Sequence, residues 1–192
     1  MHQLDIVGIG GTAKPYSSTE SALALALDSA AAAGARTRLF GGAELALLPH
    51  YLTPTAADNA IGHALVDAVR GADAVLIASP GYHGSVSGIV KNALDYLEET
   101  ARDARPYLDG VPIGLIVTAY GWQATGSTLA TLRAIVHALR GWPTPLGVTV
   151  NSTQCKFADG GCSDPAIAAQ LALVGKQLVD FANLRRTAAT DA

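Results

Sequence analysis

The sequence has few of the residues that build metal centres or disulfide frameworks. Its 192 residues include two cysteines and five histidines, and His50, His63 and His137 are isolated, so no helical i, i+4 metal pair forms. Cys155 and Cys162 match neither the C-x-x-C redox spacing nor a common zinc spacing. We therefore expect no metal site and two free thiols.

Several other features are also missing. No apolar run is long enough to cross a bilayer, and residues 1–5 lack the basic flank of a secretory signal. The net charge is −3 without a basic cluster, which argues against nucleic acid as a partner. No Gly-x-Ser-x-Gly elbow is present, which excludes the usual α/β-hydrolase nucleophile. These absences predict a cytoplasmic protein with neither a nucleic-acid nor a membrane partner.

Short apolar segments alternate with longer helical ones along the whole chain. We expect strands at residues 3–10, 35–40, 73–79, 112–119 and 145–150, and helices at 17–33, 57–70, 86–101, 126–140 and 164–185. Repeated βα units predict an α/β fold with a parallel, doubly wound sheet. The run Leu23–Leu27 alternates like a strand, but alanine dominates residues 22–33 and Gly34 follows, which favours a helix.

The domain organisation follows from the same pattern, because no linker or repeat interrupts it. We expect one domain over residues 1–185 and a flexible tail over 186–192. Two long connections, at residues 41–55 and 151–164, are candidates for functional or partner-facing loops.

Hydroxyl groups crowd the expected start of the first helix, directly after the first strand. A terminal phosphate needs several converging donors, which helix N-terminal amides and short hydroxyls supply, and a cation to offset its charge. The residues with this chemistry are Thr12, Lys14, Ser17, Ser18 and Thr19. In the alternative interpretation Ser17 or Ser18 only caps the helix and Glu20 completes a capping box. The two roles are compatible.

The same segment contains a competing motif, because Gly8-x-Gly10-x-x-Ala13 satisfies a permissive dinucleotide fingerprint. That fingerprint requires an acidic residue at the end of the second strand, where this chain has Gly41-Gly42 and only a later Glu44. The long Ser/Thr-rich turn therefore favours a monophosphate over a pyrophosphate.

A second loop follows the buried segment 74–78, at the place where α/β sheets bind ligands. Its residues are Pro80, Gly81, Tyr82, His83, Gly84 and Ser85. The stretch Ser79–Leu97 resembles the segment with which the NADPH-dependent FMN reductases of the flavodoxin-like fold hold the isoalloxazine ring. The resemblance spans the chain from Ile6 to Ala182. It implies a three-layer sandwich with a five-stranded parallel sheet of order 2-1-3-4-5 and helices on both faces.

The resemblance also assigns roles to individual positions. The family's phosphate loop, Gly-Ser-x-Arg-x-x-Ser-x-Asn/Thr, places Thr12 on its first serine, Lys14 on its arginine, Ser17 on its second serine and Thr19 on its last position. His83 stands where the family usually has asparagine. Tyr120, Gly121 and Trp122, within the stretch 120–127, correspond in position to a third flavin loop.

The resemblance implies an NAD(P)H-dependent FMN reductase with FMN and NAD(P)H as cofactors. No nucleophile or acid/base pair stands out, and flavin chemistry needs none from the protein. Reduced flavin would go to a monooxygenase, or bound FMN would reduce a quinone, an azo dye or another small-molecule acceptor. By the same resemblance the protein is a homodimer or homotetramer. The alternative is a flavodoxin-like electron carrier without nicotinamide turnover, although the chain lacks a dense acidic face.

Overall fold

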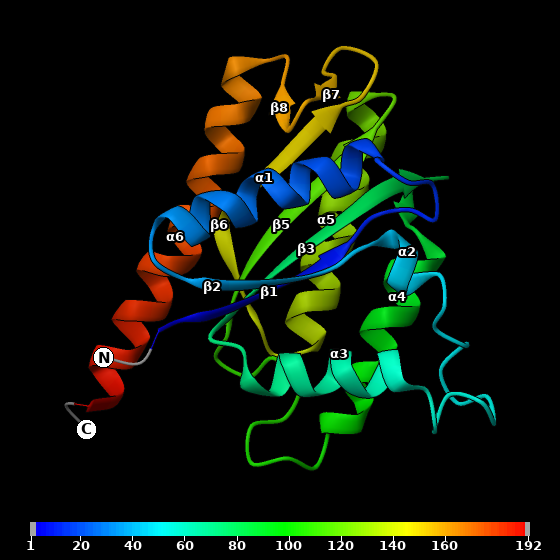
Figure 1. Cartoon of the computed structure of the whole chain (residues 1–192), viewed down its shortest axis with the longest axis vertical. Coiled ribbons are helices and arrows are strands. Elements are labelled where there is room, and N and C mark those ends of the chain that lie inside the picture. Colours follow the sequence, from blue (N-terminus) through cyan, green and yellow to red (C-terminus); the bar gives the residue numbers. More distant parts are fainter. Residues whose placement is uncertain (1–2, 191–192) are drawn as a thin grey trace.

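The computed structural model describes residues 3–190 as three layers around one twisted sheet (Figure 1). The sheet order is β2-β1-β3-β5-β6, and all neighbours in that series are parallel. Its strands are β1 (Asp5–Gly10), β2 (Arg36–Phe40), β3 (Ala74–Tyr82), β5 (Pro112–Ala119) and β6 (Trp142–Asn151). A short β4 (Ser85–Val86) pairs antiparallel with the end of β3. Counted in chain order, the five parallel strands confirm the expected order 2-1-3-4-5 and the flavodoxin-like fold class.

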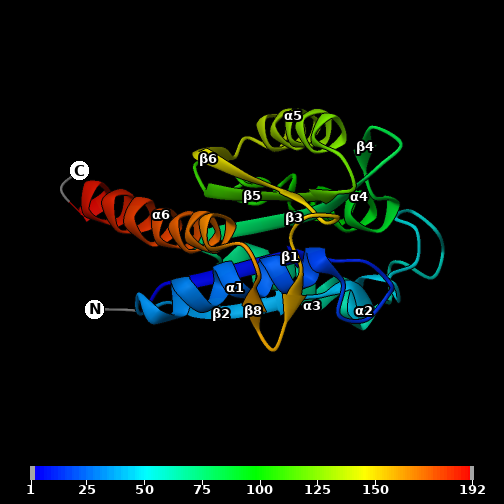
Figure 2. The ribbon, with the colours of Figure 1, turned by 90° about the horizontal axis from the view of Figure 1, so that it is seen from above.

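Helices cover both faces of the sheet (Figure 2). One face carries α1 (Ser18–Ala32) and α6 (Pro165–Thr190), and the other carries α3 (Ala60–Gly71), α4 (Gly88–Asp95), the 3₁₀ helix η1 (Tyr96–Thr100) and α5 (Trp122–Ala138). The short α2 (Gly42–Leu45) follows β2. None of the helices within residues 3–190 is both long and apolar enough to cross a membrane.

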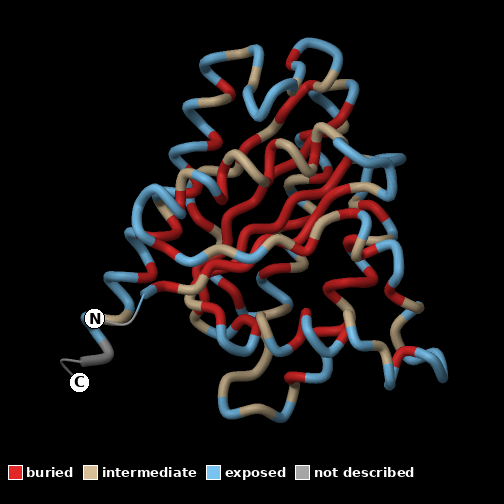
Figure 3. The backbone as a smooth tube through the Cα atoms, in the orientation of Figure 1, coloured by how far each residue is buried: buried red, intermediate tan, exposed pale blue. Residues whose placement is uncertain are grey.

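The backbone of the central strands β1, β3 and β5 is almost wholly buried (Figure 3). Their alternate side chains enter two separate cores, one on each face of the sheet. In β3, Val75 and Ile77 pack with the helices α3 to α5, while Leu76 and Ala78 pack with α1 and α6. A strand covered on both faces has a continuous apolar sequence. The apolar run at residues 74–78 therefore indicated a buried strand before the structure was known.

The alanine-rich composition of α1 reflects its close approach to α6. A Cβ atom on Gly175 of α6 would lie 2.2 Å from the carbonyl oxygen of Ala26, so only glycine fits there. The hydroxyl of Ser29 donates to the carbonyl oxygen of Ala172 at 2.9 Å. Small residues on both helices thus allow the two backbones to meet.

Several predicted boundaries were wrong, some of them where glycine or proline was taken as a breaker. Helix α3 begins at Ala60 rather than 57, and the helix expected over 86–101 is divided into α4 and the 3₁₀ helix η1. Strand β3 continues through Pro80, which pairs with Thr118 of β5, to Gly81 and Tyr82, which pair with β4. Helix α5 begins at Trp122 rather than 126, and Gly126 is an exposed position inside it. Strand β6 begins at Trp142 rather than 145.

Another wrong boundary is the end of the last helix, which was expected at residue 185. Helix α6 runs to Thr190, so the expected tail 186–192 begins inside the helix. Residues 191–192 lie outside the described part of the chain. The guanidinium of Arg186 forms an ion pair with the Asp73 carboxylate at 2.6 Å, which fastens this part of α6 to the start of β3.

Asn92 holds the long connection after β2. It is 8% exposed on α4. Its side-chain oxygen accepts from the backbone N–H of Tyr51 at 2.9 Å, and its amide nitrogen donates to the carbonyl oxygen of Pro49 at 2.9 Å. The Tyr96 hydroxyl donates to the same carbonyl at 2.8 Å. The Asn92 amide therefore supplies hydrogen bonds to backbone groups of this connection that a helix or strand would otherwise supply.

We predict that Asn92→Ala lowers the free energy of unfolding by about 2–3 kcal/mol, because it removes a buried side chain, the acceptor of the part-buried Tyr51 N–H and one of the two donors to the Pro49 carbonyl. Urea denaturation measures the change. The exposed Asn183 of α6 provides a matched control, and Asn183→Ala should change stability by less than about 0.5 kcal/mol. Equal effects of the two variants would contradict the anchoring role.

Candidate functional site

A cavity of about 420 Å³ opens at the edge of the sheet where β1, β3 and β5 end. It brings together most of the residues singled out from the sequence: Thr12, Lys14, Ser17, Ser18, Thr19, Pro80, Gly81, Tyr82, Tyr120 and Gly121. Sequence reasoning did not name five further lining residues, which are Tyr16, Thr118, Ala119, Ala124 and Ser152. His83, Gly84, Ser85 and Trp122 are not among the residues that line the cavity.

The start of α1 presents hydrogen-bond donors to this cavity. Ser17 is the N-cap, and its hydroxyl oxygen accepts from the backbone N–H of Glu20 at 3.2 Å. The N–H groups of Ser18 and Thr19 precede the first intrahelical bond, and neither donates to another described group. A helix N-terminus with free N–H groups attracts an anion.

The charge of the cavity wall has the sign that an anion requires. Lys14 is the only charged residue among the lining residues, and no carboxylate is among them. Its ammonium forms no ion pair with any carboxylate of residues 3–190. Lys14 is exposed, and its backbone N–H donates to the Thr12 hydroxyl at 3.2 Å, which shapes the loop around it.

Thr19 differs from the other predicted hydroxyl donors because its side chain is 2% exposed. Its hydroxyl lies 2.6 Å from that of Thr118 at the end of β5. This contact joins the first turn of α1 to the sheet and engages the side chain, so the backbone N–H is the donor that Thr19 offers to the cavity.

Glu20 does not complete a capping box, in contrast to the alternative raised from the sequence. Its carboxylate accepts from the backbone N–H of Gly42 at 2.7 Å, which places the negative charge beneath the loop. A Cβ on Gly42 would lie 1.8 Å from the carbonyl oxygen of Thr12. Because Gly41 and Gly42 have no side chains, the start of α2 packs directly against the loop at Thr12 and against the Glu20 carboxylate. The sequence alone did not indicate this role.

The second predicted loop is a tight hairpin. Tyr82 pairs with Ser85, and the turn residues His83 and Gly84 have φ angles of 51° and 83°. Two positive φ angles suit a short hairpin turn, in which asparagine commonly stands at the first position; His83 meets the same backbone demand. The buried Ser79 hydroxyl accepts from the N–H of Ser87 at 3.0 Å and closes the hairpin onto β3.

The predicted third loop is shorter than expected, because α5 starts at Trp122. Only Tyr120 and Gly121 remain between β5 and α5, and both line the cavity. Tyr16, Tyr82 and Tyr120 form an exposed aromatic rim, with exposed fractions of 94%, 52% and 84%. Tyr16 also has a φ of 54°, an uncommon value for a residue with a side chain, and it turns the chain into the Ser17 cap.

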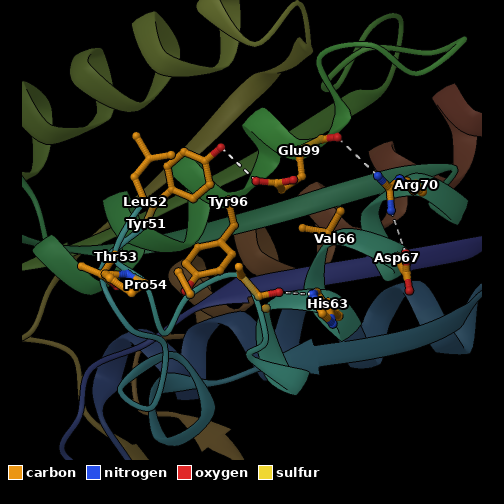
Figure 4. A pocket seen from close by; sticks show the side chains of 13 residues that line it. Tyr51, Leu52, Thr53, Pro54, His63, Val66, Asp67, Arg70, Tyr96 and Glu99 are labelled. Atoms are coloured by element: carbon orange, nitrogen blue, oxygen red, sulfur yellow. Dashed lines mark hydrogen bonds and ion pairs between the residues drawn. The ribbon is translucent and has the colours of Figure 1, made fainter.

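A larger cavity, of about 700 Å³, lies beneath residues 51–57, between α3 and η1 (Figure 4). Its charged side chains already pair with protein groups: Arg70 contacts Asp67 at 2.9 Å, and the Tyr51 hydroxyl donates to Glu99 at 3.0 Å. The ring of Tyr51 lies 5.5 Å from that of Tyr96. The carboxylates of Asp67 and Glu99 in this wall would repel an anionic ligand. The smaller edge cavity is therefore the better phosphate site.

This second cavity generates a prediction about Tyr51. Burial, together with the hydrogen bond to Glu99, raises the pKa of Tyr51 from 10.0 to about 12. The raised pKa means that any stability it contributes is present below pH 10 and is lost as the pH rises toward 12. Difference absorbance between the native protein and Tyr51→Phe should show ionisation near pH 12.

Glu99→Gln should lower the pKa of Tyr51 without restoring it to 10.0, since burial, the larger cause, remains. Glu98→Gln is the matched control for loss of charge, because Glu98 raises the pKa of Tyr51 only through its charge and accepts its hydrogen bond from the Tyr107 hydroxyl at 3.1 Å. It should lower the pKa of Tyr51 by less than Glu99→Gln does. A Tyr51 pKa unchanged by Glu99→Gln would show that the hydrogen bond contributes nothing.

Comparison with known proteins agrees with the geometry of the edge cavity. Residues 4–154 match the family model for NADPH-dependent FMN reductase. An FMN-dependent NADPH-azoreductase of Staphylococcus haemolyticus (strain JCSC1435) is 32% identical over 118 residues, which are 60% of this chain and 59% of the relative. The corresponding enzyme of Staphylococcus aureus (strain USA300) is 34% identical over 122 residues, 62% of this chain and 61% of the relative. The matches thus span about three fifths of these curated relatives.

Solved structures agree in fold. FerB, a flavoenzyme NAD(P)H:(acceptor) oxidoreductase from Paracoccus denitrificans, superposes with a TM-score of 0.74 at 23% identity, covering 94% of this chain and 97% of that one. The apo form of an NADH:FMN oxidoreductase (EMOB) gives a TM-score of 0.73 at 23% identity, covering 92% and 88%. Because the family model extends over most of the sequence, this chain belongs to the NADPH-dependent FMN reductase family.

Proposed function

We propose that the protein binds FMN in the edge cavity and catalyses its reduction by NAD(P)H. The observation that carries this proposal is the cavity wall, in which the free N–H groups of α1, two serine hydroxyls and the single cation Lys14 meet without a carboxylate. This donor set fits the phosphate of a flavin mononucleotide. Bound FMN would supply the ring that accepts hydride, which no protein side chain does.

The residues of the first loop would hold the phosphate. Ser17 and Ser18 would donate from their hydroxyls, Ser18 and Thr19 from their backbone N–H groups, and Lys14 would offset the charge. The Thr12 hydroxyl orders the loop through its contact with the Lys14 backbone. Lysine offers a point charge where arginine offers a planar fork, so the hydroxyl and amide donors carry more of the binding than in a loop with arginine.

The remaining loops would frame the ring. Pro80 pairs with β5 and Gly81 pairs with β4, so both are held in the sheet and give the cavity a rigid floor, while Tyr82 and Tyr120 stand at its mouth. Aromatic side chains at such a rim suit flat substrates that stack. We assign His83, Gly84, Ser85 and Trp122 to the outer edge, since they border the lining residues without belonging to them.

The small-molecule acceptor that this rim favours is planar, such as an azo compound or a quinone, in line with the FMN-dependent NADPH-azoreductases among the relatives. A homodimer or homotetramer, delivery of reduced flavin to a monooxygenase and a cytoplasmic location stay predictions. Sedimentation velocity of the purified protein with and without FMN measures the first of them.

Anaerobic stopped-flow absorbance tests the proposed reaction. The protein with FMN is mixed with NADH or NADPH, and the oxidised flavin band is followed. We expect rapid bleaching that saturates with the nicotinamide and distinguishes the preferred donor. Bound flavin that does not bleach would overturn the reductase in favour of an electron carrier, and absence of flavin binding would overturn the site.

The double variant Lys14→Ala, Ser17→Ala should weaken FMN binding by more than about tenfold, since charge-assisted hydrogen bonds to a phosphate contribute on the order of 1.5–3 kcal/mol each. Fluorescence quenching of the flavin measures the affinity. Lys14→Arg should retain binding because it keeps the charge.

Ser17→Ala also removes the N-cap of α1, so a second variant is needed to show the effect of losing a helix cap alone. Asn59 caps α3 in the same way, accepting from the N–H of Gly62 at 2.9 Å, and it is not among the residues lining the edge cavity. Asn59→Ala should leave FMN affinity unchanged. Unchanged affinity in the double variant would rule out the first loop as the phosphate site.

A further inference from the structure

The segment between β6 and α6 forms a small hairpin beside the candidate site. Its strands are β7 (Phe157–Ala158) and β8 (Gly161–Cys162), with Phe157 paired to Cys162. Ser152, just before the hairpin, lines the edge cavity, and the Lys156 ammonium donates to its carbonyl oxygen at 2.8 Å. On the other side the hairpin and Tyr16 line a shared cavity. The hairpin thus borders the candidate flavin site on two sides.

Both cysteines of the chain lie at the base of this hairpin. The sulfur atoms of Cys155 and Cys162 are 3.0 Å apart. Cys155 is 2% exposed and belongs to the core on the α1 and α6 face of the sheet, whereas Cys162 is partly exposed. No group of three or more metal-ligating side chains is found within residues 3–190, so the pair has no evident use as metal ligands.

We propose that Cys155 and Cys162 are a redox-sensitive dithiol that a hydroperoxide converts into an intramolecular disulfide, closing the base of the β7–β8 hairpin. The proposal goes beyond flavin reduction and does not depend on it. It assigns a modification site whose co-substrate is hydrogen peroxide or an organic hydroperoxide.

The chemistry balances in two steps. The sulfur of Cys162 attacks one peroxide oxygen; an S–O bond forms, the O–O bond breaks, and water or an alcohol leaves. The sulfur of Cys155 then attacks that of Cys162; the S–S bond forms, the S–O bond breaks, and water leaves with the proton of the Cys155 thiol. Two thiols are oxidised by two electrons, and the peroxide is reduced by two.

The order of the two sulfurs follows from their surroundings. Burial, with a further contribution from the neighbouring Cys162, raises the pKa of Cys155 to about 11, so Cys155 stays protonated near neutral pH and is a poor first nucleophile. Cys162 is the less buried of the two residues. Cys162 therefore reacts first, and the adjacent Cys155 resolves the sulfenic acid.

The disulfide would lock a hairpin that two other contacts already join. The backbone N–H of Lys156 donates to the Ser163 hydroxyl at 2.9 Å, and the N–H of Ser163 donates to the Lys156 carbonyl at 2.8 Å. A covalent link beside these bonds removes conformational freedom from the opened hairpin. Oxidation would thereby stiffen the edge of the cavity at Ser152 and Tyr16.

Thiol counting on the full chain without flavin tests the bond. Protein treated with hydrogen peroxide is denatured in an alkylating reagent, and its intact mass is measured. Reduced protein should take two alkyl groups, treated protein none, and treated protein followed by dithiothreitol two again. Both thiols still reactive, irreversible loss of either, or a disulfide between two chains would overturn the proposal.

Two variants test the order of reaction. In Cys155→Ala, Cys162 should accumulate as a sulfenic acid that dimedone traps. In Cys162→Ala, the buried Cys155 should remain fully alkylatable after the same exposure. Oxidation of Cys155 at the native rate in Cys162→Ala would overturn the assignment of Cys162 as the first nucleophile.

Hydrogen exchange tests the locking of the hairpin. We expect the amides of Lys156 and Ser163 to exchange at least about tenfold more slowly in the oxidised native protein than in the reduced one. Peroxide-treated Cys162→Ala is the matched control and should show no slowing. Equal exchange in the oxidised and reduced native protein would overturn the conformational role.

Discussion

The parallel pairing of β1, β3 and β5 is the constraint on which the candidate site depends. Gly10 lies opposite Ala78, and Pro80 lies opposite Thr118, so these strands end along one edge of the sheet. Parallel neighbours require crossover connections and therefore send their following loops to the same side. Loops that are distant in sequence therefore lie close together, because the register of the strands aligns the ends from which the loops start.

Electrostatics then determines what the converged loops can bind. The first turn of α1 contributes N–H groups, and Lys14 contributes the only charge of the cavity wall. The carboxylate of Glu20, in the first turn of α1, accepts from the N–H of Gly42. An acid in the first turn of a helix stabilises that helix, and here it also supports the α2 loop. The fold thus keeps the benefit of the acid without adding a carboxylate to the cavity wall.

Much of this architecture could be predicted from the sequence, because its signals are local. The apolar run 74–78 indicated a buried strand, and the alanine-rich residues 22–33 indicated a helix. The Ser/Thr-rich turn before that helix indicated a cluster of hydrogen-bond donors. The structure brings most of that cluster together, although its binding of FMN stays a proposal. The Tyr82–Ser85 hairpin has a local signal too, since His83-Gly84 supplies the positive φ angles that its turn requires.

Features set by partners distant in the chain could not be predicted. Pro80 belongs to β3 only because β5 pairs with it, and Gly126 is helical although glycine is a poor helix former. The task of Asn92 became visible only when the connection it holds was in place. The proximity of Cys155 and Cys162 depends on a two-residue pairing between β7 and β8, which is too short to leave a periodic signal.

The central claim is that the N-terminus of α1 with Lys14 is a phosphate site, and calorimetric titration with FMN and with riboflavin tests it most directly. The two ligands share the isoalloxazine ring and differ in the phosphate. We predict that FMN binds at least about 100-fold more tightly, since two charge-assisted hydrogen bonds at about 1.5 kcal/mol each give that ratio. Equal affinities for FMN and riboflavin would contradict the phosphate site and, with it, this account of the cavity.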